Sequence, residues 1–283
     1  SGVLNFTHFA DDTTILLSGS NLDELEVTMN EELSKLDEWL CSNRLSLNIG
    51  KTHYMLFTSK RLDLELSLRI RNVILKKPDD DVVKLLGVII DDKLSFNEHI
   101  NVLCGKLRRA CGIMYKMSSI LPKQILKMLY NSILLPHLVY CIEVWGNTSA
   151  SNRHRIANIQ NRAVRLLGAG ELIDIYRDNR ILPLNYLNKY FTLLKFFQQH
   201  VLKRSTDLSN IIVPLEPIHD YPTRFSEGLC LNIPRVHKSK FYCSFIYRGI
   251  TFWNELPSSF HSCNSFHTFK SNLRKHLMNG ICL

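Results

Sequence analysis

The sequence lacks the long apolar run of a membrane protein and the paired cysteines of a zinc protein. Its longest hydrophobic stretch, residues 133–145, is broken by Pro136, His137 and Glu143, and a membrane-spanning helix needs about 20 apolar residues. The eight cysteines include no Cys-x-x-Cys pair and no Cys/His spacing typical of tetrahedral zinc, and no signal peptide opens the chain. We therefore expect no membrane association and reduced, mostly buried cysteines in an intracellular protein of the nucleus or cytoplasm that is not secreted.

Repeats and low-complexity segments are also missing, and a composition of 45% hydrophobic and 22% charged residues is that of a globular protein. The net charge of +9 is unevenly distributed, with −6 over residues 1–100 and +15 over the remainder. An acidic front and a basic back suit a metal site joined to a surface that binds a polyanion. A solvated surface without a partner is the alternative.

An aspartate pair, Asp11 and Asp12, lies between two short runs of β-prone residues, 3–9 and 13–17. This pattern predicts a hairpin that holds both carboxylates at its tip. Adjacent carboxylates repel each other, but they are favourable when a divalent cation lies between them and a phosphate, as in two-metal phosphoryl transfer. Aspartate is also a common turn residue, so the pair alone does not decide between these interpretations.

Apolar residues at three- and four-residue steps over 22–40 predict an amphipathic helix packed on a sheet, with Asn21 and Glu24 at its start. A turn and short strand over 43–52 and a strand over 53–58 follow. Further strands are expected over 64–70, 73–75 and 82–90, with a turn at 78–81. Lys51 could neutralise charge or protonate a leaving pyrophosphate beside a metal-bound triphosphate, although an ordinary surface lysine is the alternative.

From Asn97 the apolar spacing becomes helical, which predicts helices over 97–117, from Pro122 onward and over 151–167, the last with exposed arginines. Basic residues off the apolar stripe are expected to follow the phosphates of a nucleic-acid duplex, reading charge and shape and not sequence. Ordinary solvated helix faces are the alternative. The candidate residues are Lys106, Arg108, Arg109, Lys116, Arg153, Arg155, Arg162 and Arg165.

The sequence beyond residue 170 is less informative. A helix is expected over 184–201, with Phe191, Phe196 and Phe197 in the core and not stacked on bases. Residues 205–240 are proline-rich and read as a loop-rich connection, and residues 242–253 fit either a strand or a helix. A closing helix is expected from Phe266 to Leu277.

Several of these segments resemble, in order, the reverse transcriptases of non-LTR retrotransposons of the LINE type (jockey/CR1-like). No single motif is specific, but the order of the motifs is. The resemblance rests on Phe9-Ala10-Asp11-Asp12-Thr13; on Leu45, Asn48, Lys51, Thr52, Met55 and Phe57; on Lys84-Leu85-Leu86-Gly87-Val88, Leu94, Phe96 and His99; on Tyr130, Pro136, Tyr140, Trp145 and Gly146; on Gln160-Asn161-Arg162-Ala163; and on Tyr247-Arg248-Gly249, Trp253, Pro257 and Phe269.

The resemblance implies an α+β fold. Residues 1–95 would form a partial palm of antiparallel strands plus a helix, with a primer-gripping hairpin; residues 96–170 would form a helical thumb, and residues 171–283 a helical and loop region of uncertain role. The activity implied is RNA-directed DNA polymerisation on an RNA template and a DNA primer, with deoxynucleoside triphosphates as substrates. Asp11 and Asp12 would bind catalytic Mg²⁺, the one cofactor implied, and Lys51 would lie near the leaving pyrophosphate.

In that family a third metal-binding aspartate and the fingers precede the aspartate pair, so we expect this chain alone not to polymerise and to need those segments for activity. The edge of the sheet at residues 4–9 is then expected to be exposed. Two alternatives remain. One is a nucleic-acid-binding module derived from a reverse transcriptase, in which the aspartates are only turn residues. The other is a decayed element fragment with no function.

Overall fold

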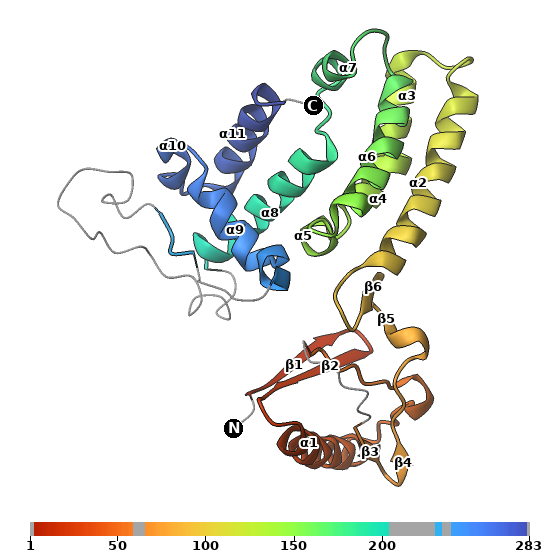
Figure 1. Cartoon of the computed structure of the whole chain (residues 1–283), viewed down its shortest axis with the longest axis vertical. Coiled ribbons are helices and arrows are strands. Elements are labelled where there is room, and N and C mark those ends of the chain that lie inside the picture. The colour runs from red at the N-terminus through yellow and green to blue at the C-terminus, as the bar shows by residue number, and fades with distance from the viewer. Residues whose placement is uncertain (1–2, 59–65, 204–229, 234–238, 282–283) are drawn as a thin grey trace, which may run out of the picture. The chain divides into compact units, whose positions relative to one another are not determined.

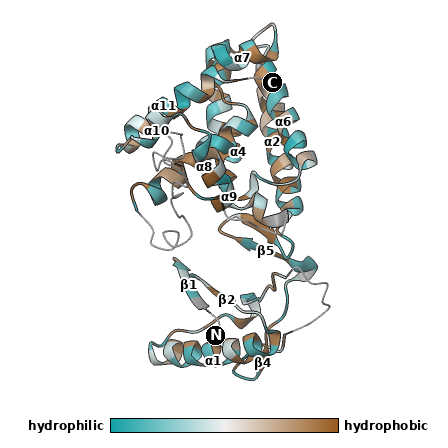
Figure 2. Ribbon diagram, turned by 60° about the vertical axis from the view of Figure 1, so that its left-hand side comes forward, coloured by the Kyte–Doolittle hydropathy of each residue, from teal (hydrophilic) through white to brown (hydrophobic). Residues whose placement is uncertain are grey.

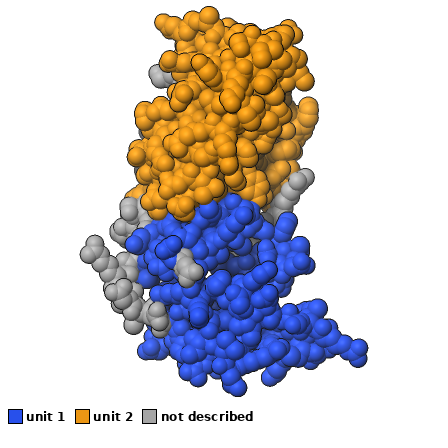
Figure 3. Space-filling model, turned by 90° about the vertical axis from the view of Figure 1, so that its right-hand side faces the viewer, with its two compact units in different colours: residues 1–93 blue, residues 94–283 orange. Residues whose placement is uncertain are grey.

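The computed structural model of the chain describes residues 3–58, 66–203, 230–233 and 239–281. The chain divides into two compact units, residues 1–93 and 94–283 (Figures 1 and 3). In the described residues, three separate pairs of antiparallel strands lie in the first unit and the second unit is helical. The mixed α+β class is therefore confirmed.

The chain opens with the expected hairpin, formed by β1 (Val3–Phe9) and β2 (Asp12–Ser18). Phe9 pairs with Asp12, so Ala10 and Asp11 alone make the turn, and Ala10 adopts a positive φ of 50°. Turns of two residues with positive φ match the right-handed twist of the strands they join. The local sequence therefore produces a tight reversal at the aspartate pair.

Helix α1 (Leu22–Ser42) begins where its sequence predicts. The Asn21 side chain accepts a hydrogen bond from the backbone N–H of Asp23 at 3.1 Å and donates one to Glu24 at 3.3 Å. On its inner face, buried Leu33 packs with Ile15 of β2, which confirms the helix-on-sheet packing. The remaining buried members of this cluster are Leu68, Ile70 and Leu75.

The strand predicted over residues 53–58 does not form. His53 makes one isolated bridge to Lys76, and the residues before it form the 3₁₀ turn η1 (Ile49–Lys51) in place of the short strand expected there. A strand needs a continuous partner for its backbone N–H and C=O groups, and the described residues provide that partner only at Lys76. The apolar residues of 53–58 therefore do not form a continuous hydrogen-bonded strand pair.

The other small strands differ in length and number from the prediction. Residues 66–75 form only the two-residue strands β3 (Arg69–Ile70) and β4 (Val73–Ile74), while 64 and 65 lie outside the described residues. The prediction of one strand over 82–90 is wrong. After the 3₁₀ turn η2 (Asp79–Asp81), the strands β5 (Val82–Leu85) and β6 (Val88–Asp91) form a hairpin. Leu86 and Gly87 have φ of 46° and 86°, which reverses the chain between them.

The second unit contains the longer helices (Figure 1). Their alternating brown and teal colouring in Figure 2 is the amphipathic pattern that the sequence predicts. Helix α2 buries Ile100, Leu107 and Met114 against α6, and α8 packs on α4, α5, α6, α9 and α11. The helices are α2 (Asn97–Met117), α3 (Lys123–Leu129), α4 (Leu135–Val139), α5 (Ile142–Trp145), α6 (Ala150–Arg165), α7 (Leu172–Asp178), α8 (Leu184–His200), α9 (Phe245–Asn254), α10 (Ser258–His261) and α11 (Phe266–Asn279), with a 3₁₀ segment η4 (Ser239–Cys243).

Helix α3 continues into a π-helical turn, η3 (Tyr130–Leu134), before α4. The backbone N–H of Leu135 donates to the Tyr130 carbonyl, five residues back, and Pro136 follows directly. Proline has no N–H and its ring crowds the preceding turn, so the wider π spacing lets the chain remain helical through it. The sequence pattern predicts the helix here but not this turn.

The C-terminal helices confirm the expected aromatic core. Phe196 and Phe197 of α8 are buried, and the ring of Phe197 stacks on Phe269 of α11 at 4.2 Å between centroids. Residues 245–254 are helical, which resolves the ambiguity there, with Trp253 packed against both phenylalanines. The expected loop-rich connection at 205–240 lies largely outside the described residues.

The cysteines are only partly as expected. The seven described cysteines are free thiols, but three are buried and the other four are half-buried or exposed, so the expectation of mostly buried thiols is wrong. Cys41 and Cys243 are the exposed ones among the described cysteines. None of the helices in the described part of the chain is both long and apolar enough to cross a bilayer.

Candidate active site and nucleic-acid interface

The tip of the first hairpin carries the aspartate pair. Asp11 lies in the turn and Asp12 is the first residue of β2, and both side chains are exposed. Phe9, directly opposite Asp12 and therefore on the same face of the hairpin, is 62% exposed. Next to the turn, the imidazole Nδ1 of His8 lies 3.0 Å from Thr13 Oγ1, which ties the two strands together.

The carboxylates at this tip fit part of a magnesium site. Carboxylate oxygens are hard ligands, and Mg²⁺ is usually held by one or two of them together with substrate phosphates and water. No third acidic, histidine or cysteine side chain completes a metal-binding group with Asp11 and Asp12 among residues 3–58, 66–203, 230–233 and 239–281. Within the described residues, this tip therefore presents two carboxylates and no further side chain of these types beside them.

Lys51 lies in the same unit as the aspartates, at the end of η1, with its side chain exposed. Its turn is held by the hydroxyl of Thr52, which donates to the Asn48 carbonyl at 3.0 Å. In the part of the chain that the structure describes, no hydrogen bond or ion pair joins Lys51 to Asp11 or Asp12. The three candidate catalytic residues are exposed on one unit, but direct contact does not bring them together.

A basic groove runs between α2 and α6. It has a volume of about 440 Å³ and is lined by Arg108 and Tyr115 from α2 and by Arg162 and Arg165 from α6, above apolar residues that include Ile159. The three arginines are exposed. Candidate residues that are 54 and 57 positions apart in the sequence therefore meet at one surface, which an aromatic ring also lines.

Cys111 also lines the groove, and its thiol is not an activated one. Burial raises the pKa of the Cys111 thiol, and this effect exceeds the lowering caused by nearby Arg162. The thiol therefore stays protonated at neutral pH and is a poor nucleophile or metal ligand. The chemistry of the groove rests on its arginines.

Two of the predicted nucleic-acid contacts are less exposed than expected. Arg153 and Arg155 of α6 are half-buried: Arg153 donates to the Thr148 carbonyl, and Arg155 donates to Asn101 at 2.9 Å and Asn152 at 3.2 Å. The bond from Arg155 to Asn101 ties the start of α6 to α2, while the bond from Arg153 stays within the start of α6 and the segment before it. The prediction that all four arginines of this helix are exposed is wrong, because a periodic pattern does not reveal which polar neighbours a long side chain will reach.

The remaining candidates lie along α2. Lys106, Arg109 and Lys116 are exposed, and Arg109 and Lys116, two helical turns apart, share the face opposite the buried stripe. Lys106 lies at one border of that stripe and Arg108 at the other, on the side of the groove. The basic residues of α2 therefore form a broad positive surface that continues into the groove.

Several known proteins are similar to this chain in sequence. The chain is 28% identical over 163 residues to the probable RNA-directed DNA polymerase from transposon BS of Drosophila melanogaster, an alignment covering 56% of this chain and 18% of that protein. It is 28% identical over 160 residues to the RNA-directed DNA polymerase from the mobile element jockey of Drosophila funebris, covering 56% and 17%. About half of this chain is similar to part of a non-LTR retrotransposon RNA-directed DNA polymerase.

A third relative is the retrovirus-related Pol polyprotein from the type-1 retrotransposable element R1 2 of Nasonia vitripennis, 25% identical over 146 residues that make up 48% of this chain and 35% of that protein. The chain spans less than a fifth of the length of the first two relatives. No family model and no solved structure matches. The resemblance to retrotransposon polymerases seen in the ordered motifs is confirmed.

One motif of the resemblance to retrotransposon polymerases has a clear structural counterpart. Lys84-Leu85-Leu86-Gly87-Val88 forms the β5–β6 hairpin, with Leu86 and Gly87 as its two-residue turn. A hairpin therefore forms at this motif, although the periodicity alone suggests a single strand; its role as a primer grip stays a prediction.

The sequence reasoning missed Tyr115. This ring is 71% exposed and lines the groove together with Arg108 and the arginines of α6. The available signal was a large aromatic residue outside the apolar stripe of an amphipathic helix. Exposed aromatic rings beside arginines are surfaces on which bases can stack.

Proposed function

We propose that this chain forms the part of a retrotransposon RNA-directed DNA polymerase that presents two metal-binding carboxylates and holds the RNA template and DNA primer. The observation that carries the proposal is the β1–β2 turn, which exposes Asp11 and Asp12 as neighbours at the end of the hairpin. A divalent cation is attracted to two such neighbouring carboxylates and relieves the repulsion between them.

In this proposal Asp11 and Asp12 hold Mg²⁺, which when bound would neutralise developing charge on the transferred phosphoryl group. The hairpin fixes the two carboxylates relative to each other, since Asp12 lies in the ladder and Asp11 in its two-residue turn. Lys51, exposed on its 3₁₀ turn, contributes positive charge toward the leaving pyrophosphate of a deoxynucleoside triphosphate.

The groove and the outer face of α2 bind the template and primer. Arg108, Arg162 and Arg165 contact phosphates, and Lys106, Arg109 and Lys116 extend the positive surface. The half-buried Arg155 acts mainly by fixing α6 against α2, and Arg153 by fixing the start of α6 to the segment before it. Binding of this type follows backbone charge and duplex shape, so it works on any sequence that is copied.

The same carboxylate pair supports the proposal that further polymerase segments are needed for activity. Two-metal catalysis requires ligands on both sides of the ions, and two carboxylates offer one side. On the hairpin, Phe6, Phe9 and Leu16 are 46%, 62% and 51% exposed. Apolar surface of this kind is suited to packing against the rest of a palm and fingers.

We place the protein in the nucleus or cytoplasm. Its described cysteines are free thiols, which fits a reducing compartment, and a polymerase that copies RNA into DNA works where nucleic acid is present.

A metal titration tests the carboxylate site without requiring polymerisation. We expect Mn²⁺, a paramagnetic substitute for Mg²⁺, to broaden the NMR signals of His8 and Thr13 beside the turn. Asp11→Asn and Asp12→Asn should each remove this broadening. The matched control is Asp92→Asn, because Asp92 is also next to an aspartate at the end of a hairpin strand.

The control also distinguishes the alternatives. Broadening that survives in Asp11→Asn, or that Asp92→Asn removes equally, would show non-specific attraction and leave the aspartates as turn residues. Primer extension by the 283-residue chain on an RNA template is expected to be absent; extension that depends on Mg²⁺ and Asp11 would overturn the claim that further segments are needed.

A further inference from the structure

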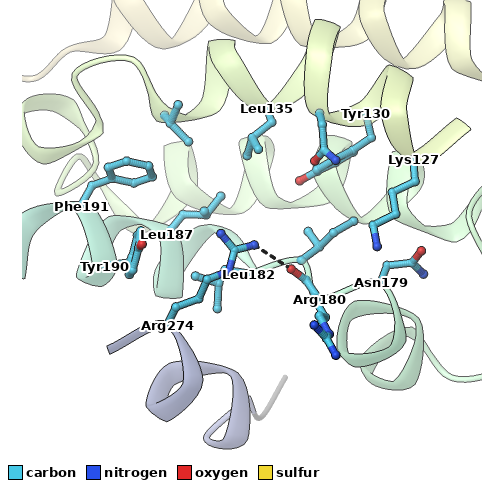
Figure 4. Close-up of a pocket in the computed structure, with 13 residues that line it drawn as sticks. Lys127, Tyr130, Leu135, Asn179, Arg180, Leu182, Leu187, Tyr190, Phe191 and Arg274 are labelled. Carbon is cyan, nitrogen blue, oxygen red and sulfur yellow. Dashed lines mark hydrogen bonds between the residues drawn. The ribbon is translucent and has the colours of Figure 1, made fainter. Parts of the chain in front are cut away.

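The second unit contains a cavity that neither the carboxylate site nor the groove uses. It has a volume of about 300 Å³ and lies where α3, the π-helical turn, the segment before α8, α8 itself and α11 come together (Figure 4). None of its lining residues lines the α2–α6 groove. It is large enough for a small organic molecule.

The lining is strongly cationic. Lys127, Arg180 and Arg274 contribute three positive charges, and among the described residues that line the cavity there is no acid. Lys127 is half-buried, and the described part of the chain gives its ammonium no ion-pair partner. Three positive charges around one cavity, two of them on the exposed Arg180 and Arg274, raise the local attraction for an anion.

Arg274 is held in place by its own contacts. One Nη donates to the Arg180 carbonyl at 3.1 Å, and Arg274 opposes the rise that burial causes in the pKa of nearby Tyr190. The bond to Arg180 leaves further N–H groups of the exposed guanidinium available, since arginine carries five. That bond restrains the side chain before any ligand arrives, which reduces the entropy lost on binding.

Tyr130 forms part of the wall of the same cavity. Its side chain is fully buried, and its hydroxyl oxygen accepts a hydrogen bond from Gln160 Nε2 at 2.9 Å. The hydroxyl is therefore engaged inside the fold, and the residue gives the cavity a fixed wall. Figure 4 shows Lys127, Tyr130 and Arg274 around one space, from three different elements.

The remaining walls are apolar. Leu135, Leu182 and Leu187 line the cavity beside the half-buried ring of Phe191. A bare inorganic anion would leave these walls without contact. A phosphate joined to an apolar or aromatic body would place its charge on Lys127 and Arg274 and its body against Phe191 and the leucines.

We propose that this cavity binds the phosphomonoester of a nucleotide, with the phosphate held by Lys127 and Arg274 and the nucleoside against the apolar walls. The ligand is either a free mononucleotide or the phosphorylated end of a nucleic-acid strand, which share this chemistry. The site does not depend on the polymerase proposal, because it uses neither the aspartate pair nor the groove.

Equilibrium titration of the 283-residue chain at low ionic strength tests the site. We expect adenosine 5′-monophosphate to bind with saturation, and adenosine without phosphate to bind at least about tenfold more weakly. Lys127→Gln should weaken nucleotide binding by about tenfold or more. The matched control Lys275→Gln removes the same charge from an exposed neighbour of Arg274 outside the cavity, so it should change the affinity by less than about twofold.

Arg274→Gln is expected to weaken binding as Lys127→Gln does, but it also removes the bond to Arg180. Lys127→Gln, which breaks no bond of the described structure, keeps the test valid if that variant does not fold. A hexanucleotide with a 5′-phosphate that competes with the mononucleotide, while its 5′-hydroxyl form does not, assigns the site to a strand end; no competition assigns it to the free nucleotide. Equal binding of adenosine, no effect of Lys127→Gln, or an equal effect of Lys275→Gln would overturn the proposal.

Discussion

Gln160 of α6 donates a hydrogen bond to the hydroxyl of Tyr130, 2.9 Å away in the π-helical turn, and both side chains are almost completely buried. The same amide nitrogen donates to the carbonyl of Leu182 at 3.0 Å. One side chain thus joins three segments of the helical unit: α6, the π turn and the segment before α8.

Replacing this amide should weaken the unit. Gln160→Leu leaves the Leu182 carbonyl buried without its donor, and unsatisfied buried polar groups cost roughly 1–3 kcal/mol each. Loss of the unpartnered Gln160 Oε1 offsets part of this cost, so we expect a net destabilisation of about 1–2 kcal/mol in urea unfolding. The control Gln124→Leu, at an exposed position of α3, should leave the unfolding free energy almost unchanged. Equal stability of the two variants would show that the bond contributes little.

Two helical glycines should respond oppositely to alanine. A Cβ on Gly249 of α9 would clash with the ring of Phe196 in α8, while a Cβ on Gly105 of α2 meets no atom within 4 Å. Overpacking costs roughly 1–3 kcal/mol, whereas alanine in an open helix position stabilises by about 0.5–1 kcal/mol. We therefore expect Gly249→Ala to lower and Gly105→Ala to raise the midpoint of thermal unfolding. A neutral Gly249→Ala would mean that α9 can move away from α8 at little cost.

The basic groove should reveal itself in the salt dependence of binding. Each phosphate contact removed lowers the slope of log affinity against log salt by about 1. Arg162→Gln and Arg165→Gln should therefore weaken binding of an RNA–DNA duplex and reduce the slope additively, with little change in stability. Arg155→Gln is expected to destabilise the chain by breaking its bond to Asn101, with a smaller effect on the slope. The reverse order, with Arg155 dominating the slope, would contradict the assignment of the groove.

Two histidines should make the helical unit sensitive to acid. Burial, with a further contribution from Lys106, lowers the pKa of His99, and burial together with His261 and Lys203 lowers that of His200. A lowered folded pKa means that the unfolded chain binds more protons below about pH 6.5, so stability should fall as pH decreases through that value and level off below the folded pKa.

Tryptophan fluorescence can follow this loss, because the ring of His99 lies 5.8 Å from Trp145 and that of His200 lies 5.6 Å from Trp253. Unfolding free energies measured between about pH 7.5 and pH 5 should decrease, and the double variant His99→Gln/His200→Gln should show a flatter curve. A wild-type curve without slope over this interval would contradict the prediction.

Local signals in the sequence located several elements well. The β-prone runs around Asp11 and Asp12 predicted the hairpin, Asn21 with Glu24 predicted the start of α1, and the apolar stripe from Ile100 to Met114 predicted α2 and its buried face. These features are set by side chains within a few residues of each other. Their energetics depend on short-range geometry, which a sequence displays directly.

Elements that need a distant partner were predicted less well. The apolar residues at 53–58 resemble a strand, but a strand requires a ladder, and the described chain supplies one bridge to Lys76. The Leu86-Gly87 reversal and the π turn before Pro136 depend on backbone angles that apolar periodicity does not encode. Hydrogen bonding across elements decided these cases.

By itself, the sequence determined the acidic hairpin tip, the basic amphipathic helices and the resemblance to retrotransposon polymerases, because residue type and order suffice for these. Only the tertiary structure decided that Arg108, Arg162 and Arg165 line one groove with Tyr115. It also decided that Arg155 donates to Asn101, and that Lys127 and Arg274 line one cavity. The physical reason is that helix packing brings together side chains tens to more than a hundred positions apart, and the charge and hydrogen-bond partners that define a site are set by those neighbours.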